Sequence, residues 1–200
     1  MRFTFQKTIR GLGLLGLLAT AGAAQAHTGH GTASLFEGLV HPLGADHLLA
    51  MLAVGLWSVA ALPAGKVWQG PATFMLALVA SAALGMLGLS VPYLEPLIAG
   101  SVVLFGALLV VSSLQLPVSA GLSLVAVAAT LHGLAHGAEA PASGFASYAI
   151  GFLLTTAVLH AIGVAAGLGL RRYFAQHTTW LLAAVGGLLG GAGLVLAASL

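Results

Sequence analysis

Charged residues and cysteine are the two things this sequence most conspicuously lacks. Six basic and four acidic residues make up 5% of the 200 residues, whereas about a quarter of a soluble domain is charged. So little charge cannot cover a soluble surface, which excludes an ordinary soluble globular protein, a disordered tail and a nucleic-acid-binding protein. The absence of cysteine excludes a disulfide framework, thiolate metal sites and a cysteine nucleophile.

Apolar residues and glycine take the place of the missing charge. Residues of the apolar class form 60% of the chain, and glycine contributes 28 residues. Small residues allow membrane helices to approach closely, and glycines recur at a spacing of four at Gly163 and Gly167, Gly186 and Gly190, and Gly187 and Gly191. The composition therefore predicts a close-packed bundle of membrane helices.

The first segment has the pattern of a secretory signal peptide. Arg2, Lys7 and Arg10 form a basic region, residues 11–20 form a short apolar run, and Ala24-Gln25-Ala26 is a small-x-small cleavage signal. We predict a signal peptide over residues 1–26 and a transport domain over residues 27–200. An uncleaved first transmembrane helix is the alternative.

The rest of the chain divides into six apolar runs long enough to cross a membrane, which takes roughly 20 residues each. The fold class predicted is all-α, a polytopic membrane bundle of six transmembrane helices. The runs end at polar, proline or glycine breaks, the weakest of which is 115–117. They cover about 42–62, 71–91, 96–116, 118–138, 145–170 and 179–199.

Charge predicts how these spans are oriented. Lys66, Arg171 and Arg172 fall in alternate loops, as the positive-inside rule requires of cytoplasmic loops, and Glu95 and Glu139 fall in the others. With the signal peptide, this predicts a multi-pass protein of the bacterial inner membrane, whose mature N-terminus and C-terminus are both periplasmic. The lipid bilayer is its first expected partner.

The fourth span carries ionisable residues on one face. At about 100° per residue, His136 lies about 40° from His132, and Glu139 about 20° to its other side. Ionisable residues within a membrane usually line a pathway or a site. Imidazole and carboxylate are ligands for nickel, cobalt, copper and zinc, so these three are candidate metal ligands. The alternative is a pair of core histidines bonded to backbone.

The first span opens with a second polar group. His41 precedes a proline and therefore avoids helical backbone, so it can turn toward His47 although a straight helix would separate the two. Asp46 is either a ligand or a residue that fixes the tautomer of an imidazole. As an alternative, Asp46 complements the helix dipole.

His160 stands alone in the fifth span, about 22 Å below its outer end at the rise of a helix. Together with the shallower histidines it predicts a path leading inward, rather than one ring of ligands. His27 and His30 at the mature N-terminus are as well explained by a frayed terminus. His177 is expected to have no metal role, and Met51 is either a soft ligand or core packing.

These polar blocks resemble the HupE/UreJ family of hydrogenase and urease accessory membrane proteins. The His132-Gly133 to Glu139 block and Leu159-His160 belong to the resemblance, and His-x4-Asp-His is similar to the signature of nickel/cobalt permeases. The first block matches at His41, Pro42, Gly44, Asp46, His47, Leu49, Ala50, Met51, Val54, Gly55 and Trp57.

The resemblance implies a secondary transporter, not an enzyme, that imports Ni²⁺ or Co²⁺ for metalloenzyme assembly. No cofactor is expected beyond the transported ion, and further candidate partners are a second copy of the chain and the hydrogenase or urease maturation machinery. The metal residues are His41, Asp46, His47, His132, His136, Glu139 and His160.

Two alternatives stay open from the residues alone. One is a membrane-embedded zinc hydrolase in which His132, His136 and His160 hold the metal and Asp46 is the base. The other is an accessory protein that binds metal without transporting it.

Overall fold

A computed structural model describes residues 34–114, 116–141 and 143–200. The predicted signal peptide and cleavage site, along with His27 and His30, lie outside these residues. The described part is helical throughout, with no strand. Its main helices are α2 (Leu35–Val40), α3 (Ala45–Ala61), α4 (Gln69–Met86), α5 (Leu94–Val110), α6 (Val118–Ala138), α7 (Phe145–Tyr173) and α8 (Thr178–Ala198). Four short 3-10 helices complete it: η1 (His41–Leu43), η2 (Ala64–Lys66), η3 (Val111–Leu114) and η4 (Ala175–His177).

The membrane bundle predicted from the apolar runs is confirmed in its coarse form. Among the described residues, five helical segments are long and apolar enough to cross a membrane, and they correspond to the second through sixth predicted spans. The first predicted span differs, because α3 is preceded by a bend of 73° from the segment formed by α2 and η1. Counting that bent pair as one span gives six. The weak break near 115–117 is real, since α6 begins only after η3 has ended.

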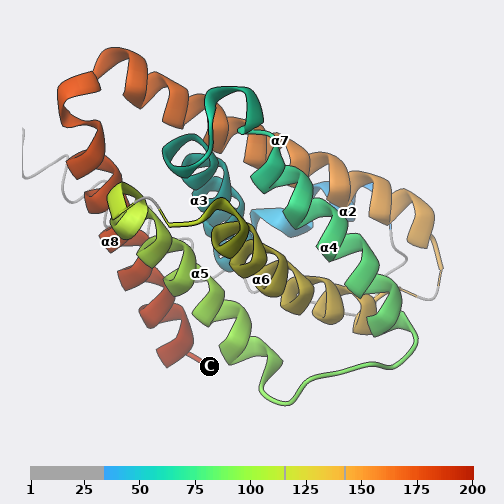
Figure 1. Ribbon diagram of the computed structural model, residues 1–200. Coiled ribbons are helices and arrows are strands. Elements are labelled where there is room, and N and C mark those ends of the chain that lie inside the picture. Colours follow the sequence, from blue (N-terminus) through green and yellow to red (C-terminus); the bar gives the residue numbers. More distant parts are fainter. Residues whose placement is uncertain (1–33, 115, 142) are drawn as a thin grey trace, which may run out of the picture.

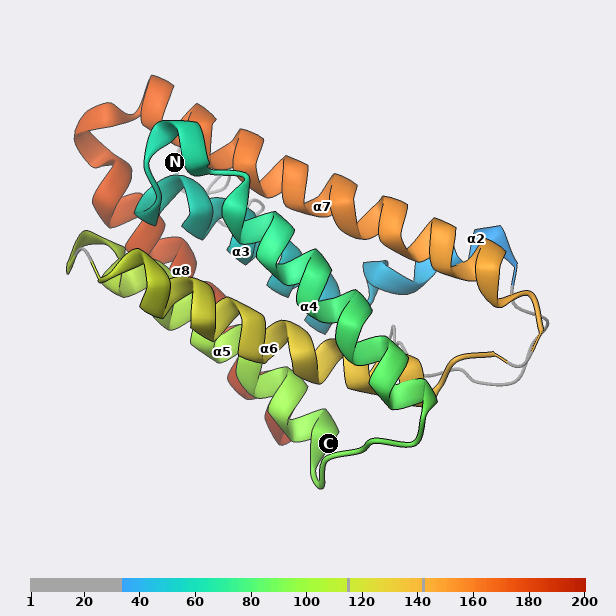
Figure 2. The same cartoon turned by 45° about the vertical axis from the view of Figure 1, so that its right-hand side comes forward.

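Helices pack in three close pairs, which Figures 1 and 2 show from two sides: α3 with α7, α4 with α6, and α5 with α8. In each pair, a Cβ added to particular glycines would collide with the backbone of the other helix, so only glycine permits the approach. These glycines are Gly55 and Gly163 for α3 and α7, Gly85 and Gly137 for α4 and α6, and Gly106 and Gly186 for α5 and α8.

The predicted spacing of small residues is thus confirmed only in part. Gly163 and Gly186 lie at helix contacts, whereas a Cβ on Gly187 or Gly191 would meet no described atom within 4 Å. Large apolar side chains also cover much of the outside, Leu76 and Val195 being 73% and 70% exposed. That is the surface expected of a bundle whose solvent is lipid.

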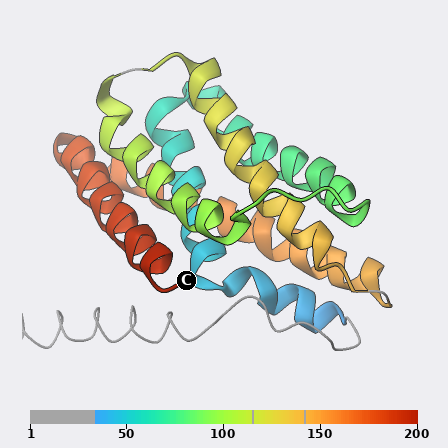
Figure 3. The same ribbon diagram turned by 90° about the horizontal axis from the view of Figure 1, so that it is seen from below.

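The irregular backbone before α3 is built by its own sequence. Ser34 and Glu37 form a capping box that starts α2. Pro42 lies in the first turn of η1, where its missing N–H costs nothing, and Gly44 caps α3. The Thr155 hydroxyl on α7 donates to the Leu39 carbonyl at 2.9 Å and holds this segment against α7. Figure 3 shows α2, in blue, turning away from the axis of α3.

The bundle has two ends that differ in charge. Figures 1 and 2 show the α3–α4 and α7–α8 connections at one end and the α4–α5 and α6–α7 connections at the other. The first end is basic, because it carries Lys66, Arg171 and Arg172, and the second is acidic, because it carries Glu95 and Glu139. At the basic end, Arg171 donates to the Ala60 carbonyl at 3.4 Å and joins the ends of α7 and α3. The alternation of basic and acidic loops expected from sequence is therefore present in the helix arrangement.

Candidate metal site

Three histidines from two helices meet near the acidic end of the bundle. His47 lies in the first turn of α3, and His132 and His136 lie one turn apart near the end of α6. One ring nitrogen of each lies within 4.8 Å of the other two, and all three residues are buried. We call these three residues the His triad. The i, i+4 pair predicted on one face of the fourth span is in place, and α3 supplies the third imidazole.

The nitrogens that face one another can be identified. His47 Nε2 lies against His136 Nε2 and 3.3 Å from His132 Nδ1. The triad therefore presents Nε2 from two residues and Nδ1 from the third. Neutral imidazoles offer one lone pair each to a divalent transition metal, and three of them converge here from two separate helices.

Ser101 of α5 is hydrogen-bonded to the ring nitrogen of His132 that does not face His47. The Ser101 hydroxyl donates to the Ile98 carbonyl at 2.7 Å, which uses the only proton of that oxygen. The same oxygen lies 2.9 Å from His132 Nε2. While the hydroxyl donates to Ile98, this oxygen accepts the proton of Nε2, and a bare Nδ1 then faces the triad. The sequence reasoning missed Ser101, for which a lone serine in an apolar span was the only signal.

Asp46 lies beside His47 and not among the triad nitrogens. Its Oδ1 is 3.1 Å from His47 Nδ1, a contact that lacks the alignment of a hydrogen bond. The same oxygen accepts a hydrogen bond from the His47 backbone N–H at 2.9 Å. Its charge favours a proton on Nδ1 of His47, which leaves Nε2 for a ligand. Of the roles as ligand and as tautomer-fixing residue, the geometry favours the one in which Asp46 orients an imidazole. Asp46 also lies in the first turn of α3, where its charge complements the helix dipole.

His41 approaches the triad from η1. The expectation that the residue before proline would avoid helical backbone is wrong, because His41 has φ −52° and ψ −46°. The chain leaves helical backbone at Gly44, which has φ −53° and ψ 145°. Its ring centroid is 4.9 Å from that of His136 and 6.0 Å from that of His47. It is partly exposed. His41 thus lies beside the triad, between the fully buried imidazoles and the outside of the bundle.

Aromatic rings that the sequence reasoning did not single out surround the histidines. Phe152 of α7 lies 4.6 Å from His136 between ring centroids, and Tyr148 lies 5.7 Å from His41. Phe74 of α4 is fully buried and lies 5.6 Å from His132. These rings keep water away from the histidines. Nothing in the apolar sequence of their helices indicated that they would lie beside the histidines.

His160 of α7 is not part of the triad. Its predicted depth along the fifth span had separated it from the other histidines. Its Nδ1 donates to the Thr156 carbonyl at 2.8 Å, so the second nitrogen, Nε2, carries a lone pair. That Nε2 is buried, and no described group bonds to it. Phe74 links the two places, since its ring centroid is 5.0 Å from that of His160.

The remaining candidates are not among the three converging ligands. Glu139 follows the last residue of α6 as its C-cap and is exposed, so the stripe predicted for it does not bring it into the group of three nitrogens. Met51 is fully buried in the apolar core. His177 is exposed on η4 at the basic end, 6.4 Å from the Trp180 ring.

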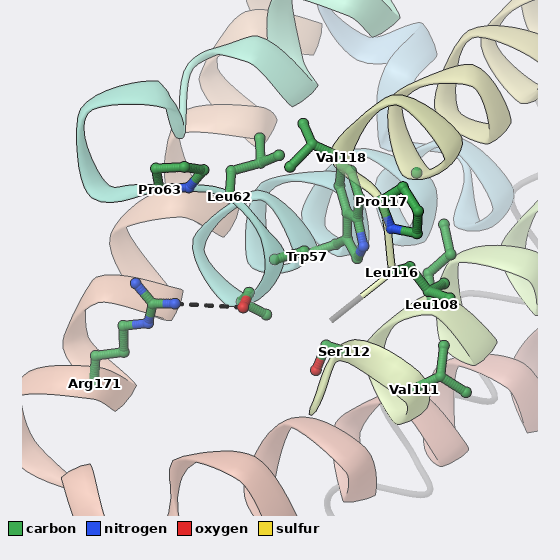
Figure 4. A pocket seen from close by; sticks show the side chains of 13 residues that line it. Trp57, Leu62, Pro63, Leu108, Val111, Ser112, Leu116, Pro117, Val118 and Arg171 are labelled. Carbon is green, nitrogen blue, oxygen red and sulfur yellow. Dashed lines mark hydrogen bonds between the residues drawn. The ribbon is translucent and has the colours of Figure 1, made fainter. Parts of the chain in front are cut away.

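The far end of α3 borders a cavity of a different kind. About 330 Å³ in volume, it lies at the basic end between α3, η3 and the start of α6. Figure 4 shows the Trp57 ring on one wall and Arg171 reaching the Ala60 carbonyl. Its other lining residues are mainly apolar, with Ser112 the exception. Among the residues that line it, none is a histidine or a carboxylate.

Comparison with known proteins agrees with the resemblance in the sequence. The family model described as HupE / UreJ protein matches residues 15–196. A curated relative named Protein HupE, from Rhizobium leguminosarum bv. viciae, is 37% identical over 152 residues, which are 75% of this chain and 78% of the relative. No solved structure matches the chain significantly.

Proposed function

Because this chain belongs to the HupE/UreJ family, we propose that it is a permease that carries a divalent transition-metal ion across the membrane. Ni²⁺ is the favoured ion and Co²⁺ the next. The observation that carries the proposal is the His triad, three buried imidazoles whose ring nitrogens converge within 4.8 Å inside a membrane bundle. Burying ionisable side chains in lipid is costly, and they are retained there for ion pathways and sites.

The donor set suits an ion that must be released again. Imidazole nitrogens bind Ni²⁺, Co²⁺, Cu²⁺ and Zn²⁺, and the chain has no thiolate that would retain the ion more tightly. His47 belongs to the close pair of α3 and α7, whereas His132 and His136 belong to the pair of α4 and α6. A movement of one pair against the other would separate the ligands, which is the movement that alternating access requires.

The direction proposed is from the periplasm to the cytoplasm, to supply metalloenzyme assembly. The triad and His41 lie near the acidic end, which the distribution of basic residues assigns to the outside. In this proposal His41, His47, His132 and His136 receive the ion, Asp46 orients His47, and Glu139 attracts the cation to the entrance. His160, with a free lone pair deeper in the bundle, receives it next.

The hydrolase alternative is less well supported by the geometry. It requires His132, His136 and His160 to hold one zinc ion, but His47 and not His160 completes the group of three. Asp46 would have to be the base, and it is instead engaged with His47. The accessory protein that binds without transporting uses the same triad, so only a flux measurement separates it from a permease.

The test is uptake of ⁶³Ni²⁺ by vesicles reconstituted with the purified chain. We expect accumulation above that of empty vesicles and a strong reduction by excess Co²⁺. Binding of Ni²⁺ to the purified protein without any uptake would identify the accessory protein, and absence of both would overturn the metal assignment. Vesicles containing His47→Ala protein serve as the matched control for leakage.

A further inference from the structure

The hydrogen bonds around His132 indicate how one of the proposed metal ligands is held in position. We propose that Ser101 is a positioning residue for the metal site, acting through the tautomer of His132. This inference rests on the proposed function, in which His132 is a metal ligand. Ser101 does not itself bind the ion in this proposal. It fixes which ring nitrogen of His132 is free to bind it.

The assignment depends on a count of protons. The Ser101 hydroxyl has one proton, which it gives to the Ile98 carbonyl at 2.7 Å. The bond of 2.9 Å between this oxygen and His132 Nε2 therefore requires the proton of the imidazole. A neutral imidazole has one N–H, so Nδ1 is left with its lone pair, 3.3 Å from His47 Nε2.

The opposite tautomer would spoil the site in two ways. It would turn an N–H toward the other triad nitrogens, where a cation has to sit, and the Ser101 hydroxyl would have to turn from the Ile98 carbonyl to the bare Nε2. Both groups are buried, Ser101 being 3% and His132 0% exposed, so water cannot replace the hydrogen bond that the Ile98 carbonyl loses. Outer partners that fix a ligand's tautomer are typically worth 10–100-fold in metal affinity.

Ser101 also ties a third helix pair to the site. It lies on α5, which packs closely on α8, whereas the triad comes from α3 and α6. The hydrogen bond to His132 is therefore a polar link between α5 and the ligands. A shift of α5 that broke it would release the constraint on the tautomer and weaken the hold on the ion.

The experiment compares three variants of the full chain in detergent micelles. Ser101→Ala removes the acceptor, Ser101→Thr keeps a hydroxyl, and Ser58→Ala is the matched control. Ser58 is also fully buried and donates to a carbonyl, that of Val54, at 2.7 Å, but the structure shows it bonded to no histidine. Affinity for Co²⁺ is measured by competition with a chromophoric chelator. The tautomer of His132 in metal-free protein is measured by ¹⁵N chemical shifts, assigned with His132→Asn.

We expect Ser101→Ala to lower Co²⁺ affinity by about 10–100-fold and to shift His132 from the Nε2–H form toward a mixture. Ser101→Thr should restore most of the affinity, and Ser58→Ala should change neither quantity. An unchanged tautomer in Ser101→Ala, or equal losses of affinity in Ser101→Ala and Ser58→Ala, would overturn the positioning role. If the wild-type chain binds no metal, the proposed function fails, while the metal-free ¹⁵N measurement still decides whether Ser101 sets the tautomer.

Discussion

The two ends of α3 show how differently one helix can be used. At its start, His47 meets two other buried imidazoles, with Asp46 beside it. At its finish, Trp57 and Ala60 border a largely apolar cavity beside the cationic Arg171. On the proposed function, a divalent cation would be held at the first end, whereas the residues that line the cavity at the second end include no histidine or carboxylate. Capture of the ion would then be confined to the triad end of the bundle, with His160 as the next ligand.

The sharpest way to break this comparison is to remove the ligand from the start of α3. His47→Ala takes away the imidazole that joins α3 to α6, and the two histidines left on α6 cannot enclose an ion alone. We expect metal binding and ⁶³Ni²⁺ uptake to fall to background while the protein still reaches the membrane. Isothermal titration calorimetry with Ni²⁺ measures binding.

The control for that variant is at the opposite end. His177→Ala removes an exposed imidazole from η4 and should leave binding and uptake as in the wild-type chain. Wild-type uptake by His47→Ala would instead assign His47 a structural role.

His160 tests whether passage is separate from capture. Because it lies apart from the triad, His160→Ala should leave the equilibrium affinity near that of the wild type. It should cut uptake by about tenfold, a rise of about 1.4 kcal/mol in the barrier. Calorimetry and vesicle uptake on the same preparation measure the two quantities. Equal losses of affinity in His160→Ala and His136→Ala would mean that one closed site contains all of these residues.

Gly137 tests whether the binding end depends on close helix packing. A Cβ at this position would collide with the Ala82 carbonyl of α4. Gly137→Ala should therefore push α6 outward and cost about 1–3 kcal/mol of stability, as overpacked sites do. Thermal unfolding in micelles measures it. Gly187→Ala, where a Cβ has open space, is the matched control, and a similar loss there would show that the helix contact is unimportant.

The smallest effect is expected at the basic end. Arg171→Gln removes a long hydrogen bond to the Ala60 carbonyl from an exposed side chain. Its loss should cost less than about 1 kcal/mol and leave metal affinity unchanged. The same unfolding and calorimetry experiments apply. A large fall in affinity would show that the cavity and the triad are coupled, contrary to the comparison above.

The sequence predicted the parts of this molecule that follow a helical period. The spans appear as apolar runs, and His132 with His136 appears as an i, i+4 pair, because both patterns lie within one helix. The proline after His41 predicted non-helical backbone at His41, which is wrong, because His41 is right-handed helical and the break falls at Gly44. What the sequence could not give is the contact between helices: His47 against His136, Ser101 against His132 and Phe74 beside His160 depend on how α3 to α7 pack. Glu139 shows the same limit, because its place on the stripe depended on where α6 ended.

The unequal lengths of α3 and α7 have a consequence for the surrounding bilayer. At 1.5 Å per residue, the 17 residues of α3 span about 25 Å and the 29 residues of α7 about 43 Å. The hydrocarbon core is about 30 Å thick, so α3 is too short for it, while α7 must tilt or protrude. The helix α2 exposes apolar side chains that can lie in the part of the bilayer that α3 is too short to span: Leu35, Phe36 and Val40. The segment of α2 leads into the start of α3, where His47 lies. On the proposed function, membranes of different thickness should therefore alter how readily an ion reaches the triad.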